Sequence, residues 1–106
     1  MNEQLQQIKE HWDKTADSAW YQSLRTEEQI QALLEEPARA FHPAVWQMIR
    51  RFLPDFQGKK VLLPSSGDNH AAFALARLGA EIVSADISET QLERAREIAQ
   101  RHGLPI

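Results

Sequence analysis

The residues that could do chemistry gather at two points of the chain, 65–69 and 86–87. The first run reads Ser-Ser-Gly-Asp-Asn, and its small side chains would let a ligand approach the backbone closely. Asp86 follows Gly67 by about 20 residues, the spacing at which a carboxylate meets ribose hydroxyls in nucleotide-binding units. The spacing therefore predicts a site for an adenosine-containing ligand.

Each of these features also has a purely structural explanation. A turn of small residues between a strand and a helix reverses the chain whether or not a ligand binds there. Asp86 stands just before Ser88, where a carboxylate would stabilise the N-terminus of the following helix. Both explanations stay open at the level of sequence.

Strands and helices alternate around these residues. The apolar run Lys60–Leu63 predicts a strand, and because it lacks polar alternation we expect it to be covered on both faces. A helix is expected from Asn69 to Leu78, with Gly79 at its end, and a second strand from Ile82 to Ala85. A crossover between parallel strands brings both strand ends to one edge of the sheet, where ligands of α/β proteins bind.

Apolar residues at helical spacing, serine or threonine capping patterns, and helix-ending prolines or glycines predict further helices. They are expected near 5–12, 27–36, 43–53 and 89–102. The predicted fold class is therefore α/β, with a helical N-terminal segment followed by the first β-α-β-α of a Rossmann-like parallel sheet.

The domain organisation is expected to be incomplete. Residues 1–57 are interpreted as a helical lead-in or lid segment, and residues 58–106 as the first half of a Rossmann-like domain. Two parallel strands with two open edges do not make a stable sheet by themselves. We therefore expect a truncated domain, either a fragment of a longer protein or a product that needs a partner to cover its edges.

The turn is a poor match to the dinucleotide fingerprint G-x-G-x-x-G. Its three glycine positions fall on Ser65, Gly67 and His70, so two glycines are missing. Asp68 would also place a negative charge beside the phosphates. A cationic ligand without phosphate reverses that argument, because the sulfonium and ammonium groups of S-adenosylmethionine suit nearby carboxylates. A fragment of a nicotinamide-dependent oxidoreductase remains an alternative.

The stretch from Lys60 to about Gly103 resembles the opening of class I S-adenosylmethionine-dependent methyltransferases. Their usual pattern is V-L-D-x-G-x-G-x-G, a helix, a second strand ending in an acidic residue, and a helix that begins S-x-x-x-L-x-x-A. This chain departs from it where Leu63 replaces an acid and where Ser65 and Asn69 replace the outer glycines. The matching residues are Val61, Leu62, Gly67, Asp86, Ile87, Ser88 and the run from Gln91 to Arg96.

The resemblance implies S-adenosyl-L-methionine as the cofactor and a small-molecule methyl acceptor in the parent protein. It implies that Asp86 binds the ribose hydroxyls, that Ile87 packs on adenine, and that the preceding turn faces the methionine part. The implied cofactor-binding residues are Ser65, Ser66, Gly67, Asp68, Asp86 and Ile87. Later strands and loops complete such sites, so we expect the isolated chain to be inactive.

Aromatic and histidine residues outside this pattern allow two explanations. The segment around Trp12, Trp20 and Tyr21 is similar to the lead-in of such enzymes, which can fold over the cofactor, and packing in the core is the alternative. His70 follows the turn and could touch a ligand. The histidines show no metal-ligand spacing. No catalytic residue is identified, which is compatible with methyl transfer because that reaction depends largely on positioning.

Composition narrows the function classes. The chain has 106 residues, a net charge of -3 and no cysteine. The mild acidity argues against a nucleic-acid partner, and no apolar run is long enough to span a membrane. Without cysteine or a secretory signal at Met1–Gln4, we expect a cytoplasmic protein. A non-enzymatic module that self-associates through open sheet edges is the other alternative.

Overall fold

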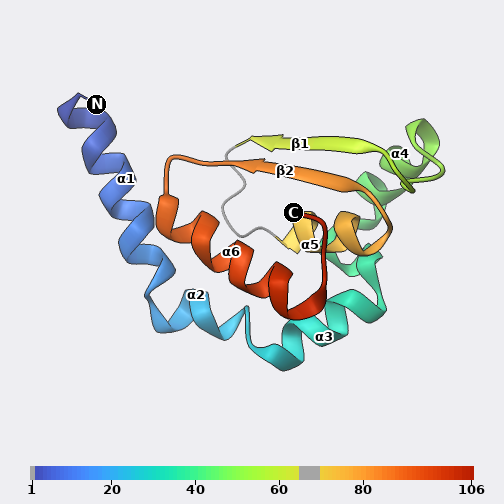
Figure 1. Cartoon of the computed structure of the whole chain (residues 1–106), viewed down its shortest axis with the longest axis horizontal. Coiled ribbons are helices and arrows are strands. Elements are labelled where there is room, and N and C mark those ends of the chain that lie inside the picture. Colours follow the sequence, from blue (N-terminus) through green and yellow to red (C-terminus); the bar gives the residue numbers. More distant parts are fainter. Residues whose placement is uncertain (1, 65–69) are drawn as a thin grey trace.

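The computed structural model describes residues 2–64 and 70–106 (Figure 1). The described helices and strands follow the order predicted from the sequence, with helices first and then β-α-β-α, so the α/β fold class is confirmed. They are α1 (Glu3–Ala16), α2 (Ala19–Ser23), α3 (Glu27–Glu35), the 3-10 helix η1 (Pro37–Ala40), α4 (Pro43–Phe52), β1 (Lys60–Pro64), α5 (His70–Arg77), β2 (Glu81–Ala85) and α6 (Glu89–His102).

Local capping explains where several of these helices begin. The Thr26 hydroxyl accepts the backbone N–H of Gln29, and the Ser88 hydroxyl accepts that of Gln91, so both predicted caps are confirmed. The short helix α2 begins in the same way, because Ser18 Oγ accepts the backbone N–H of Tyr21. The sequence interpretation missed α2 and η1, which are too short to show a clear apolar period.

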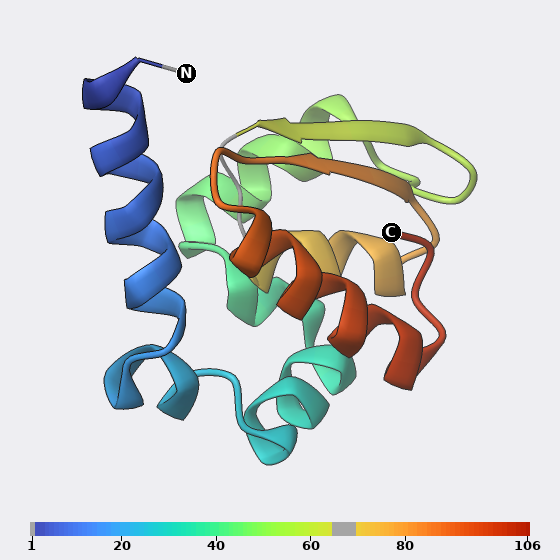
Figure 2. The ribbon, with the colours of Figure 1, turned by 60° about the vertical axis from the view of Figure 1, so that its left-hand side comes forward.

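β1 and β2 form a parallel sheet in which Lys60 pairs with Glu81 and Pro64 with Ala85. Helices α5 and α6 lie on the same side of the two strands in both views (Figures 1 and 2). The opposite face is open: Leu62 is 64% exposed, and its neighbour Val83 is 59% exposed. The prediction that β1 is covered on both faces was therefore wrong. Along β1, exposed residues alternate with partly buried ones, because the described elements cover only the side of the strand that faces α5.

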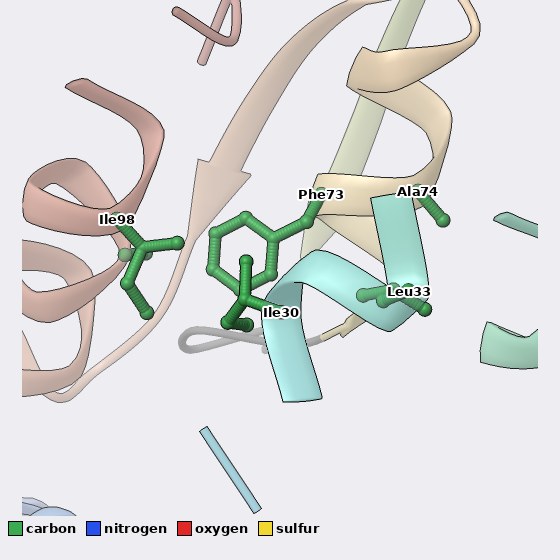
Figure 3. Close-up of a cluster of buried hydrophobic side chains, with 6 residues drawn as sticks. Ile30, Leu33, Phe73, Ala74 and Ile98 are labelled. Atoms are coloured by element: carbon green, nitrogen blue, oxygen red, sulfur yellow. The ribbon is translucent and has the colours of Figure 1, made fainter. Parts of the chain in front are cut away.

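One core cluster joins the N-terminal helices to the second half of the chain. Ile30 and Leu33 of α3 pack against Phe73 of α5 and Ile98 of α6 (Figure 3). Phe73 is fully buried, and burial of such a side chain contributes about 1.5–3 kcal/mol of hydrophobic stabilisation. This cluster fixes α3, α5 and α6 relative to one another.

A second cluster lies between α4, α5 and β2. The Trp46 ring stacks between Phe41 and Phe56, with centroid distances of 5.4 and 6.0 Å, so it packs in this cluster. Phe56 is buried beside Leu75 and Ile82. The first cluster packs α3 against α5 and α6, and the second holds β2 against α5 through Ile82.

Candidate functional site

A cavity of about 550 Å³ lies between the N-terminal helices and the C-terminal end of β2. Ile8 and Trp12 of α1 and Tyr21 of α2 form its apolar and aromatic side. Asp86 and Ile87, which directly follow β2, face the same cavity. In both ribbon views α1 runs past the turn between β2 and α6 (Figures 1 and 2). This volume falls within the range of small-molecule sites.

Asp86 takes part in the turn that starts α6. Its Oδ1 accepts the backbone N–H of Ser88 at 2.9 Å, and the Ser88 hydroxyl in turn caps the helix. This bond supports the structural explanation of Asp86, in which its carboxylate stabilises the start of the following helix. The same carboxylate nevertheless lines the cavity, so stabilising the turn and facing a ligand are compatible roles.

A cation lies on another wall of the cavity. The Arg25 guanidinium carbon is 3.7 Å from the centroid of the Tyr21 ring, and Nη1 donates to the Tyr21 carbonyl at 3.1 Å. Desolvation by burial lowers the pKa of Arg25 to about 10, so the side chain stays charged at neutral pH. Cation–π contact with Tyr21 stabilises this charge where water is partly excluded.

His70 lines the cavity beside Arg25. Its Nε2 lies 3.0 Å from the Leu24 carbonyl oxygen, a distance that suits a neutral ring donating from Nε2. Burial, and then the charge of Arg25, lower the pKa of His70 below its usual value of 6.5. The ring is therefore predominantly neutral at pH 7. Among the residues that the structure describes, the cavity is lined by one guanidinium, one neutral imidazole and the Asp86 carboxylate.

Polar contacts attach α1 to the β2–α6 turn. The Ser88 hydroxyl donates to Asp13 Oδ1 at 2.5 Å, and Gln91 Nε2 donates to the Trp12 carbonyl at 3.0 Å. Lys9 Nζ donates to Asp13 Oδ2 at 2.6 Å. The hydrogen bonds from Lys9 and then Ser88 lower the pKa of Asp13, so the carboxylate is charged at neutral pH.

The structure brings some of the predicted site residues together and not others. Asp86, Ile87, Trp12 and Tyr21 line one cavity, whereas Trp20 is 68% exposed and does not line it. The predicted contacts of Ser65, Ser66, Gly67 and Asp68 lie outside the described residues.

Sequence reasoning missed the cavity positions of Arg25 and Gln91. Arg25 follows Tyr21 by four residues, the helical spacing at which a cation reaches an aromatic ring, and this was the available signal. Gln91 was noted only in the capping pattern and in the run that matches the family pattern, and no local signal pointed to its bond with α1.

The arrangement can bind a small molecule that has both polar and apolar parts. A carboxylate, a guanidinium and aromatic side chains suit hydroxyls, an acidic group and a flat ring, respectively. Within residues 2–64 and 70–106, no three acidic or histidine side chains converge as metal ligands. No helix of the described chain is both long and apolar enough to cross a membrane.

Comparison with known proteins adds no relative: the chain matches no protein-family model, no curated protein and no solved structure. Any functional assignment therefore depends on the sequence pattern around Asp86 and on the geometry of the cavity. The two sources share Asp86 and Ile87, and the cavity adds residues from the first half of the chain that lie outside the pattern.

Proposed function

We propose that this chain is the cofactor-binding part of a class I S-adenosylmethionine-dependent methyltransferase. The single observation that carries the proposal is the position of Asp86 and Ile87. They lie at the C-terminal end of β2 and line the same cavity as Trp12 and Tyr21. Ligands of parallel α/β sheets bind at this edge.

The polar groups of the cavity suit the parts of this cofactor. Asp86 would accept hydrogen bonds from the ribose hydroxyls, and Ile87 would pack on the adenine ring. Arg25 would hold a carboxylate, for which a planar guanidinium is well matched. The positive charges of the ligand are suited to Asp86. The ligand and the cavity therefore match, because each carries both positive and negative groups.

The residues of this chain would bind and orient the cofactor. When bound, S-adenosylmethionine supplies a methyl group already activated by its sulfonium. Trp12 and Tyr21 would exclude water from one side, and neutral His70 would add a polar group without adding charge. The methyl acceptor would be a small molecule, and its binding elements are expected in strands and loops that complete the site. We therefore expect little or no methyl transfer by the isolated chain.

Calorimetric titration with S-adenosylhomocysteine tests the proposal. We expect saturable binding by the wild-type chain and a loss of about tenfold in affinity for Asp86→Asn, since a hydrogen bond to a charged group contributes about 1.5–3 kcal/mol. Asparagine keeps an oxygen to accept the Ser88 backbone N–H, so the turn is preserved. Absence of binding by the wild-type chain would refute the proposal.

Asp55→Asn is the matched control. Asp55 Oδ1 accepts the backbone N–H of Gln57 at 3.0 Å, the same local contact that Asp86 makes with Ser88, but Asp55 does not line the cavity. Its replacement should leave the affinity unchanged. A parallel titration with NAD⁺ tests the oxidoreductase alternative. Tighter binding of the dinucleotide than of S-adenosylhomocysteine would favour that alternative.

A second candidate function is association through the sheet. The exposed apolar pair Leu62 and Val83 on the open face is the observation that favours it. Sedimentation velocity over a range of concentrations would then show a mass that rises with concentration. The double change Leu62→Lys with Val83→Lys should abolish the rise, whereas Met48→Lys, at a similarly exposed position on α4, should not. A monomer at all concentrations would count against association.

A further inference from the structure

We infer that Asp13 and Ser88 are positioning residues that hold α1 in place as a wall of the cavity, and that ligand binding at Asp86 is coupled to the docking of α1. This inference rests on the proposed function, because it concerns how the same cavity takes up its ligand. It adds two residues that the family pattern does not assign to cofactor binding, and it makes α1 part of the site.

Ser88 connects the two sides of the cavity. Its backbone N–H donates to Asp86 Oδ1, and its hydroxyl donates to Asp13 Oδ1, 75 residues earlier in the chain. Ser88 is fully buried, whereas the Asp13 side chain at the other end of the bond is 23% exposed. The orientation of the Asp86 carboxylate and the placement of α1 therefore depend on the same residue.

Few apolar contacts hold α1 by themselves. Ala16, at its C-terminal end, is its one buried residue among those described. Ile8 and Trp12 line the cavity yet remain 41% and 44% exposed. An element with so little buried surface opens at low free energy, so the polar contacts of Trp12 and Asp13, near its C-terminal end, have a large influence on its position.

A ligand in the cavity would complete the packing of α1. Ile8 and Trp12 line the same cavity as Asp86 and Ile87, where the nucleoside is proposed to bind. Covering them adds apolar contact that exists only in the bound state, and a ligand shifts an equilibrium toward the state that it contacts better. The bond between Asp13 and Ser88 lowers the cost of this shift by holding α1 near its bound position beforehand.

Hydrogen exchange of the whole chain, with and without S-adenosylhomocysteine, tests the coupling. In the wild-type protein we expect the ligand to slow exchange across α1, most at residues 9–13. Asp13→Ala should speed exchange of α1 in the free protein and weaken ligand binding about tenfold, because it removes a hydrogen bond to a charged group. Fluorotryptophan labelling gives a second readout, in which the fluorine resonance of Trp12 shifts on binding and that of Trp46 does not.

Two further variants separate positioning from general destabilisation. Asp13→Asn keeps an acceptor oxygen for the Ser88 hydroxyl and should restore binding to within about threefold of wild type. Asp17→Ala removes an ion pair with Arg94, also between α1 and α6, but Asp17 does not line the cavity and its loss should leave the affinity unchanged.

The outcomes distinguish the two proposals. Ligand binding with unchanged exchange in α1, or wild-type affinity in Asp13→Ala, would overturn the positioning role and leave the proposed function standing. Failure of the wild-type chain to bind S-adenosylhomocysteine at all would overturn both.

Discussion

His70 Nε2 lies 3.0 Å from the carbonyl oxygen of Leu24, 46 residues earlier in the chain, and this contact joins the start of α5 to the connection between α2 and α3. Burial and the nearby charge of Arg25 favour the neutral imidazole in the folded state. The unfolded chain has no such preference, so the contact makes stability depend on pH.

We predict that acidification destabilises the protein through His70. Its folded-state pKa is lowered, so its contribution is fully present above the unfolded value of 6.5. Below pH 6.5 the unfolded state binds the proton more readily, and stability falls until the folded-state pKa is passed. Urea unfolding between pH 8 and pH 5 measures the effect. The difference in unfolding free energy between wild type and His70→Gln should shrink with acidification.

Phe73 is predicted to be the most sensitive position of the core. Its ring is fully buried among residues of α3, α5 and α6, so Phe73→Ala should lower the unfolding free energy by about 3–5 kcal/mol through lost burial and a cavity. Phe52→Ala is the control, because Phe52 is 81% exposed and its loss should change stability by about 0.5 kcal/mol or less. Similar losses in both variants would contradict the assignment of this core.

The open face of the sheet predicts opposite sensitivities at two adjacent residues. Ile82 is buried and Val83 is largely exposed. Ile82→Thr should destabilise the protein by about 2 kcal/mol, since it buries a hydroxyl and removes apolar area, whereas Val83→Thr should stay within about 0.5 kcal/mol of wild type. Denaturant titration of the two variants measures this difference. A comparable cost at Val83 would mean that a second layer covers this face.

Gly79 and Gly103 are predicted to tolerate alanine differently. Both have positive φ, 100° and 65°, but a Cβ on Gly79 would overlap the Gln57 side chain, whereas one on Gly103 meets nothing within 4 Å. Gly103→Ala should cost about 1 kcal/mol from backbone strain alone, and Gly79→Ala should cost more. Adding Gln57→Ala to Gly79→Ala should recover the part due to the clash, and thermal unfolding would detect it. Equal costs for the two glycines would argue against this geometry.

Sequence alone determined the elements whose signals are local. A capping hydroxyl contacts a backbone N–H three residues later, so Thr26 and Ser88 mark the starts of α3 and α6 through their spacing in the chain. Gly103 marks the end of α6 in the same way, through its left-handed backbone. The order of helices and strands, and hence the α/β class, follows from such signals together with the apolar periods.

Tertiary structure decided which face of β1 is covered, because its apolar run is equally compatible with one or two covering layers. It also decided the cavity, which Asp86 lines together with Trp12 and Arg25, and the bond between Asp13 and Ser88. These residues are far apart in the chain and meet only when α1, α2 and α6 have packed. Hydrogen bonds within one turn of helix leave a fixed spacing in the sequence, whereas contacts across the fold depend on how all the helices pack and leave none.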